Sequence, residues 1–299
     1  MLGILNINKP EYMTSRRVVD VVTRLAGTKR AGHAGTLDPL ASGVLVVCVG
    51  RTTKLVSYLQ ERPKKYSATF LFGRRSNTDD ITGQVVEVVD ARAPQRGEVE
   101  AALQAFVGTI MQVPPQFSAV HVGGRRAYKA ARRGMAVEVE PRPVVVHRIE
   151  LREYAAPELV VDIECGSGTY IRSIGRDLGN ALGCGAVMSS LVRTAIGEFT
   201  LDSAVKLPDL EFEPASISRF LLPTLQAVAH LPRRQCDPDE CTALLQGRTI
   251  PAQPDTALNG TAVVIVDPEG KFFALTEFAL DPPRLRPRQV FGGECVQKP

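Results

Sequence analysis

Hydrophobic and polar positions follow two different periods along the chain, and each period predicts a different type of element. Residues 44–49 are uninterruptedly apolar, which predicts a buried strand. Residues 66–72 and 84–89 alternate between apolar and polar positions, and the polar loop 76–83 lies between them, so we expect an antiparallel pair. Residues 159–165 alternate in the same way and predict a further strand.

Three other segments have the spacing of amphipathic helices. The first begins at Thr14 or Ser15, either of which can cap it, and ends before Gly27. The other two cover residues 98–107 and 171–182. No internal repeat or low-complexity tract interrupts this order of strands and helices. We therefore expect an α+β fold, with a mixed, mainly antiparallel sheet and flanking helices.

Two regions depart from this pattern. Residues 121–143 contain paired glycines and many basic residues but few core positions, so we expect them to protrude as a basic arm. Residues 206–222 mix Pro, Asp and Glu, which predicts a connector. Two domains are expected, at residues 1–222 and 223–299, and the second should be mostly β. Its predicted elements are a short helix at 239–245 and a β-hairpin made of 262–266 and 272–275.

Charge is distributed unevenly along the 299 residues, whose net charge is only +4. Residues 1–75 carry 13 basic against 4 acidic residues, whereas residues 206–299 carry 10 against 12. A second basic patch covers residues 121–152, where one lysine and seven arginines face three glutamates. Such asymmetry suggests a polyanionic partner, although charge alone is equally typical of an ordinary solvated surface.

The spacing of cysteines and histidines argues against a metal site or a disulfide framework. None of the six cysteines forms a C-x-x-C pair, and none of the four histidines has a neighbour at the spacing of zinc ligands. The first nine residues become polar too soon for a secretory signal, and no apolar run is long enough to cross a membrane. We therefore expect a cytoplasmic protein without a metal.

The segment Gly32 to Gly43 carries the most informative candidate for chemistry, Asp38. Small residues around it allow a backbone to approach a ligand closely. Pro39 fixes its own φ and biases Asp38 toward an extended conformation. A carboxylate held at the mouth of a buried strand suits acid–base or covalent chemistry. The alternative is an aspartate that only initiates a turn.

Several blocks in sequence order support the chemical interpretation of Asp38. They are Asn8-Lys9-Pro10 through Thr14-Ser15, Gly32-His33-Ala34-Gly35-Thr36-Leu37-Asp38-Pro39 through Gly50, Lys65-Tyr66 with Gly73 and the loop to Gly83, Pro114-Pro115 through Ser118-Ala119 to Gly134, Gly168-Thr169-Tyr170-Ile171-Arg172-Ser173, and Leu191-Val192-Arg193-Thr194. From about residue 3 to 205 the chain resembles the TruB family of tRNA pseudouridine synthases, which make pseudouridine 55 in the T-loop of tRNA. Small departures are Thr53, where alanine is usual, and Ser76, where threonine is common.

This resemblance implies a pseudouridine synthase fold and three catalytic residues. Asp38 is the essential carboxylate, and it could attack C1′ of the target uridine, add to C6 of the base, or remove the C2′ proton to give a glycal. Arg172 is its counter-charge, since an adjacent guanidinium favours the charged carboxylate. Tyr66 stacks on the uracil, and its hydroxyl is a candidate for removing the C5 proton. A cross-strand aromatic is the alternative for Tyr66.

Further residues are implied in substrate binding. His33 is expected to act as a wedge that replaces the flipped uridine, although a hydrogen-bonded turn histidine is the alternative. Tyr170 is expected to pack against Arg172 or the pocket floor, Leu191 to form an apolar wall or simply part of the core, and Lys9 to shape the rim. Phosphate contacts are assigned to the arm residues Arg125, Arg126, Lys129, Arg132 and Arg133.

The resemblance also implies partners and excludes some. The T-loop and T-stem of tRNA are the expected substrate, with no cofactor, metal, membrane or protein partner, and the protein is expected to be a monomer. The C-terminal module is loosely similar to PUA-like RNA-binding domains. Three rival functions remain: an RNA chaperone on the same scaffold, a guide-RNA-dependent synthase acting on rRNA, and a glycosidase. A glycosidase usually needs two cooperating carboxylates, and the sequence suggests only one.

Overall fold

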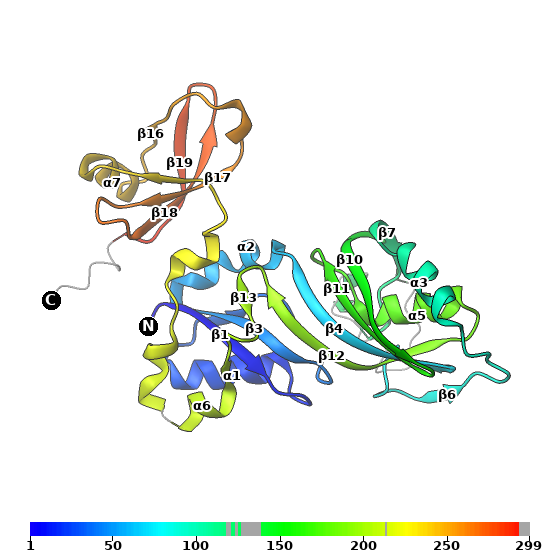
Figure 1. Ribbon diagram of the computed structural model, residues 1–299. Coiled ribbons are helices and arrows are strands. Elements are labelled where there is room, and N and C mark those ends of the chain that lie inside the picture. The colour runs from blue at the N-terminus through cyan, green and yellow to red at the C-terminus, as the bar shows by residue number, and fades with distance from the viewer. Residues whose placement is uncertain (118–120, 123–124, 127–138, 213, 293–299) are drawn as a thin grey trace.

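The computed structural model describes the chain except for residues 118–120, 123–124, 127–138, 213 and 293–299. Figure 1 shows a long twisted sheet with helices beside it and a smaller β module at one end. No helix within the described residues is long and apolar enough to cross a membrane.

The large sheet contains ten described strands and confirms the expected mixed, mainly antiparallel α+β fold. Its strand order is β14-β1-β3-β12-β4-β11-β10-β7, with β2 beside β3 and β13 beside β12. Only the β1–β14 and β3–β12 pairs are parallel. The bounds are β1 (Gly3–Lys9), β2 (Ala31–His33), β3 (Ser42–Val49), β4 (Lys64–Phe72), β7 (Gly108–Gln112), β10 (Arg142–Ala155), β11 (Glu158–Cys165), β12 (Ala186–Ile196), β13 (Phe199–Thr200) and β14 (Val205–Lys206).

Strand β3 is apolar throughout because both of its faces are covered. Val44 and Val46 point into one core cluster, whereas Leu45 and Val47 point into another on the opposite face. All four are fully buried. A strand buried on both faces loses the alternation of a half-exposed strand, which explains the uninterrupted apolar run at 44–49.

Helices cover the large sheet at both ends (Figure 1). The bounds are α1 (Ser15–Leu25), α2 (Val56–Glu61), α3 (Arg96–Gln104), α5 (Ile171–Ala181), α6 (Leu207–Phe212) and the 3-10 helices η1 (Gly50–Leu55), η2 (Pro214–Phe220) and η3 (Thr224–Val228). Thr14, one of the two caps expected from the sequence, caps α1 by accepting a hydrogen bond from the Arg17 backbone N–H at 3.1 Å. Helices α1 and α5 confirm their predicted ranges, whereas α3 begins two residues earlier and ends three residues earlier than expected.

One strand pairing predicted from the sequence is wrong. The segment at 84–89 forms β6 (Val85–Glu87), which pairs with β5 (Arg74–Ser76) and not with β4. Both edges of β4 are already occupied by β11 and β12. Gly73, with φ +77°, turns the chain out of the sheet after β4. Alternation alone indicated two strands, but it could not indicate their neighbours.

The arm is described only at its ends. Its first part forms a small hairpin of β8 (His121–Val122) and β9 (Arg125–Arg126), and residues 127–138 lie outside the description. The expected boundary at residue 143 falls inside β10, so the sheet begins earlier than predicted. The predicted connector 206–222 is also more ordered than expected, because it forms α6 and η2.

A second sheet forms the C-terminal module. Its order is β15-β17-β18-β19-β16, with bounds β15 (Arg233–Gln235), β16 (Ile250–Pro251), β17 (Ala262–Val266), β18 (Phe272–Ala279) and β19 (Arg284–Val290), beside α7 (Pro238–Leu245) and η4 (Thr256–Leu258). This confirms the predicted helix and hairpin. Val264 and Phe272 share a buried cluster with Ile4 and Val44 of the large sheet, so the module packs against the first domain. The domain division at 222/223 stays a prediction.

Candidate active site

The loop between β2 and β3 presents Asp38 just before β3, which begins beside β12 in the interior of the sheet. Gly43 has φ +100°, and a Cβ there would lie 2.3 Å from the Arg193 carbonyl oxygen, so only glycine lets β3 start beside β12. Ser15 holds the loop from the first turn of α1, because its hydroxyl accepts a hydrogen bond from the Leu37 N–H at 2.8 Å and lies 3.1 Å from the Leu37 carbonyl oxygen. The loop is therefore held from two sides.

Lys9 lies beneath this loop and not at its rim. Its side chain is fully buried, and its ammonium group donates to the carbonyl oxygens of Met13 at 2.7 Å, Pro10 at 2.8 Å and Pro39 at 3.4 Å. Burial lowers the Lys9 pKa to about 8. Because no part of the side chain reaches the surface, the expected substrate contact of Lys9 is corrected to support of the loop.

Arg172, from the first turn of α5, faces the Asp38 carboxylate with two nitrogens. Its Nε lies 2.9 Å from Oδ2, and its Nη2 donates a hydrogen bond of 3.0 Å to Oδ1. The arginine side chain is only 5% exposed, whereas the Asp38 side chain is 31% exposed. The structure thus brings together the two charged residues expected from the sequence, with the carboxylate on the solvent side.

A second carboxylate, Asp80, was missed by sequence reasoning. Its Oδ2 lies 3.4 Å from Nη1 of Arg172, and its side chain is 5% exposed. Its Oδ1 accepts hydrogen bonds from Thr78 and from the backbone and hydroxyl of Thr82. A second carboxylate therefore lies beside the one expected from the sequence, although it is buried. The polar loop 76–83 was visible in the sequence, but nothing in its spacing distinguished Asp80 from the adjacent Asp79.

Arg172 also ties the neighbouring backbone to this pair of carboxylates. It donates to the carbonyl oxygens of Thr78 at 2.9 Å and Phe117 at 3.2 Å. One helical turn further, Arg176 pairs with Asp79 at 2.9 Å. Asp79 has φ +61°, a left-handed conformation that aspartate tolerates better than most residues. Side chains of α5 thereby fix the loop that carries Asp80.

Burial dominates the acidity of Asp38. Desolvation raises its pKa above the ordinary 3.8, the charge and hydrogen bond of Arg172 act in the opposite direction, and the charge of Asp80 raises it again. The net direction is upward. Arg172 thus favours the ionised form, as expected, but it does not outweigh the removal of water.

Tyr66 and Arg193 occupy adjacent strands next to Asp38. Tyr66 lies on β4 opposite Arg193 of β12, and its ring is 9% exposed. Burial raises the Tyr66 pKa, whereas the charge and a hydrogen bond of Arg193 lower it. Arg193 is 1% exposed and donates to the carbonyl oxygens of Val44 at 2.7 Å and Gly35 at 3.0 Å. The resemblance included Arg193 only as part of a motif, without a role.

Leu191 joins Tyr66 and the Asp38 loop in one apolar cluster. It is 4% exposed, and the same cluster contains Leu37, Leu40 and Ala41. Leu191 is therefore a core leucine, and its role as an apolar wall against the base stays a prediction.

Tyr170 precedes α5, and His33 lies on β2. Arg142, and not Arg172, stacks on the Tyr170 ring, with its guanidinium carbon 5.1 Å from the ring centroid. His33 ends β2 opposite Val47, so it is a strand residue and not a turn residue. Burial and the charges of Arg193 and Arg16 lower the His33 pKa, which favours a neutral ring that can stack.

The five basic arm residues cannot be placed as contacts. Lys129, Arg132 and Arg133 lie outside the described residues, and only the backbone of Arg125 and Arg126 is described, in β9. Among the described residues, no cluster of three or more His, Cys, Asp or Glu side chains could hold a metal ion.

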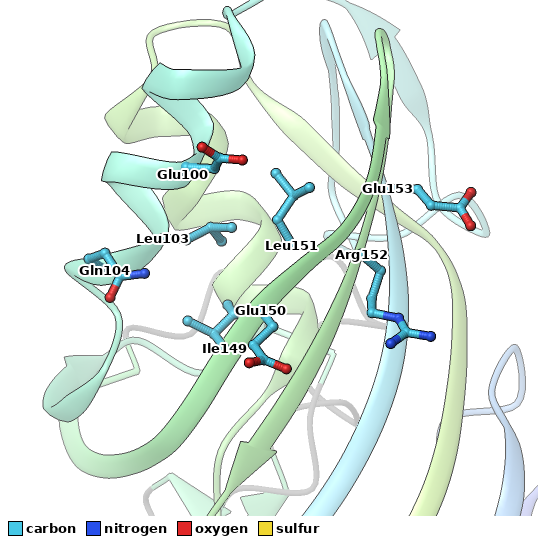
Figure 2. A pocket seen from close by; sticks show the side chains of 8 residues that line it. All are labelled: Glu100, Leu103, Gln104, Ile149, Glu150, Leu151, Arg152 and Glu153. Atoms are coloured by element: carbon cyan, nitrogen blue, oxygen red, sulfur yellow. The ribbon is translucent and has the colours of Figure 1, made fainter.

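A cavity of about 550 Å³ lies elsewhere, between α3 and β10. Figure 2 shows Leu103, Ile149 and Leu151 between the helix and the strand, with Arg152 and Glu153 turned away from the helix. Glu100 and Glu150 also line it. None of the predicted site residues contributes to this cavity, and its carboxylates would repel a nucleic-acid phosphate.

Comparison with known proteins identifies the family. A model described as the TruB family pseudouridylate synthase N-terminal domain matches residues 23–171, and a model of the tRNA pseudouridylate synthase B C-terminal domain matches residues 172–229. A Mycobacterium tuberculosis protein named tRNA pseudouridine synthase B is 42% identical over 277 residues, which cover 91% of each chain. The chain belongs to the TruB family. A protein of the same name from Thiobacillus denitrificans is 41% identical and covers 92% of this chain and 91% of its own.

Solved structures confirm the fold of this TruB family member. One described as a Cbf5-Nop10-Gar1 complex superposes with a TM-score of 0.75 at 25% identity, covering 97% of this chain and 84% of that chain. Another, of an H/ACA RNP bound to a substrate RNA containing 2′-deoxyuridine, has a TM-score of 0.74 at 23% identity with the same coverage. The second likeness bears on the fold alone.

Proposed function

We propose that the protein is a tRNA pseudouridine synthase that converts uridine 55 in the T-loop to pseudouridine. One observation carries the proposal: a buried arginine, Arg172, holds the partly exposed carboxylate of Asp38 at 2.9 and 3.0 Å. The names of the curated relatives support the tRNA substrate. The reaction breaks the N1–C1′ bond, rotates the uracil and joins C5 to C1′, so the substrate and product are isomers.

Asp38 is proposed to be the catalytic carboxylate. Attack on C1′, addition to C6 and removal of the C2′ proton all need its ionised form. Its position beside Arg172 favours the charged carboxylate against the desolvation that raises its pKa. Asp80 is proposed to be a positioning residue, because both of its oxygens are already engaged by Arg172, Thr78 and Thr82.

The pocket around Asp38 is proposed to hold the flipped uracil. Tyr66 stacks on the base, Leu191 forms its apolar wall, and His33 fills the vacated space in the RNA stack. Tyr170, fixed by Arg142, borders the same end of α5. Arg193 holds the loop through its hydrogen bonds, and its charge lowers the pKa of Tyr66.

Tritium release from tRNA labelled at uridine C5 tests the proposed function. The wild-type protein should release stoichiometric tritium and produce pseudouridine at position 55 without added metal or cofactor. Intact tRNA binding without release would favour the RNA chaperone or the guide-dependent rRNA enzyme. The glycosidase is disfavoured because the Asp80 side chain is only 5% exposed and faces Arg172, so it is badly placed to reach a substrate as the second carboxylate.

The Tyr66→Phe variant should bind tRNA normally but release C5 tritium about 100-fold more slowly. Its ring can still stack, but it lacks the hydroxyl that Arg193 polarises. Single-turnover release and nucleoside analysis would show glycosidic cleavage without finished product. Tyr154→Phe, whose parent hydroxyl donates to the Pro94 carbonyl oxygen at 2.5 Å, is the matched control. A normal rate in Tyr66→Phe would remove the hydroxyl from the mechanism.

Binding of tRNA should weaken steeply with salt, since the basic arm is proposed to contact phosphates. Neutralising Arg125, Arg126, Lys129, Arg132 and Arg133 together should reduce the slope of log Kd against log salt by up to about 4. Filter binding over a series of salt concentrations measures both slopes. A flat profile for the wild type would contradict the assignment.

The remaining partners and location are proposals of the same kind. We infer a monomer that needs no protein partner, because the arm supplies the chain with its own basic RNA-binding segment. The C-terminal module is proposed to bind RNA in the manner of PUA-like domains. A cytoplasmic location follows from the tRNA substrate.

A further inference from the structure

Tyr12 combines a strained backbone with an exposed side chain. Its φ of +58° places it in the left-handed region, where a bulky residue is a genuine outlier. Its side chain is 75% exposed, so packing does not compensate for the conformation. Strain of this kind is found mostly where a function requires it, and it therefore asks for an explanation.

The position of Tyr12 places it at the candidate site. Its backbone N–H donates a hydrogen bond of 2.6 Å to the carbonyl oxygen of Pro39, the residue directly after Asp38. The left-handed conformation thus joins the β1–α1 turn to the catalytic loop. Lys9 reaches the same Pro39 oxygen from below, at 3.4 Å.

Two exposed arginines close to Tyr12 could contact a phosphate beside a stacked base. Exposed Arg16 and Arg17 follow it on the first turn of α1, with Glu11 before it and with Asp20, which pairs with Arg16 at 2.8 Å. The Arg16 side chain is 80% exposed, and its charge acts on His33 at the end of β2. An exposed aromatic ring and two exposed arginines therefore belong to the segment that contacts the Asp38 loop.

We propose that the Tyr12 ring is a stacking platform for a nucleobase next to the flipped uridine. This inference rests on the proposed function. Extruding a uridine removes a stacking partner from its neighbours, and an aromatic face can replace that partner for any base. The hydrogen bond to Pro39 fixes the platform relative to Asp38, and this fixed geometry accounts for the strained backbone.

Tryptophan fluorescence tests the contact directly, because the chain contains no tryptophan. Tyr12→Trp provides a single emitter, and stacking should quench it as unmodified tRNA transcript is added. Phe212→Trp is the matched control. Phe212 is 88% exposed. Its neighbour Glu211 pairs at 2.7 Å with Arg24, near the C-terminal end of α1. That end of the helix lies about 15 Å from Tyr12. Unchanged Tyr12→Trp emission at saturating tRNA would overturn the proposal, as would equal quenching in both variants.

A second comparison separates stacking from backbone effects. Tyr12→Asn removes the ring but introduces a residue that tolerates left-handed φ, so the melting temperature of the variant should not fall. Its KM for tRNA should rise about tenfold with kcat unchanged, whereas Tyr12→Phe should keep the wild-type KM. A wild-type KM in Tyr12→Asn would refute the platform.

The two proposals fail in different ways. Quenching reports a base on residue 12 whether or not isomerisation follows, and the KM comparison applies only to an active enzyme. Absence of tritium release from the wild type would reject the synthase function. Normal release together with an unquenched Tyr12→Trp variant would reject only the platform.

Discussion

The Asp38→Asn variant should form pseudouridine at least about 10,000-fold more slowly than the wild type. Each of the three chemistries open to Asp38 uses the negative oxygen that asparagine lacks. The amide also offers one acceptor where the carboxylate offers two, so one of the Arg172 nitrogens at 2.9 and 3.0 Å would face another donor. The substitution thus removes the charge and disturbs the contact that holds it.

Tritium release and filter binding together make this test specific. Binding of tRNA should persist in Asp38→Asn, since the phosphate contacts lie elsewhere. Asp202→Asn, the same change at an exposed aspartate after β13, is the matched control and should release tritium like the wild type. Substantial release from Asp38→Asn would show that another group performs the chemistry.

Arg172→Gln should lower the rate at neutral pH by about 100- to 1,000-fold and shift the acid limb of the rate profile. Arg172 supplies the two largest influences that lower the Asp38 pKa, whereas burial and Asp80 raise it. Without the guanidinium the Asp38 pKa rises further. As the pH falls, the carboxylate is therefore protonated at a higher pH than in the wild type. Raising the pH should then restore part of the rate, which a purely structural defect would not allow.

This variant should also be less stable, because Asp80 would remain buried without its cation. Removing one partner of a buried ion pair costs about 3 to 5 kcal/mol, and the Arg172 and Asp80 side chains are both 5% exposed. Adding Asp80→Asn should recover much of that loss in denaturant unfolding and move the acid limb back toward lower pH. If the acid limb of Arg172→Gln coincided with that of the wild type, Arg172 would not be lowering the pKa of the catalytic carboxylate.

Arg176→Gln provides the control for Arg172→Gln. Arg176 lies one turn along α5 and holds Asp79 at 2.9 Å without contacting Asp38. Its loss should loosen the loop 76–83 and lower the rate moderately, while the acid limb keeps its wild-type position. A shift equal to that of Arg172→Gln would mean that any change in α5 perturbs Asp38.

Helices and strands could be predicted from the sequence where interactions between residues close in the chain determine them. The cap at Thr14, the helix that follows it, and the buried strand at 44–49 were predictable from residue type and spacing. The pairing of β6 was not, because period-two alternation defines a face and leaves the neighbouring strand undefined. Only the occupied edges of β4 and the turn at Gly73 directed β6 to β5.

The candidate site shows the same division. Asp38, Tyr66 and Arg172 could be named from the sequence, since they stand in motifs that are recognisable one block at a time. Asp80 and the burial of Lys9 could not, because both depend on contacts between segments far apart in the chain. Asp80 meets Arg172 across 92 positions, and Lys9 reaches Pro39 across 30. Sequence by itself thus determined the family, the elements and the central carboxylate. Tertiary structure alone decided which charges meet, which are buried and in which direction the Asp38 pKa moves, because desolvation and Coulomb interactions depend on distance in space and not on spacing in sequence.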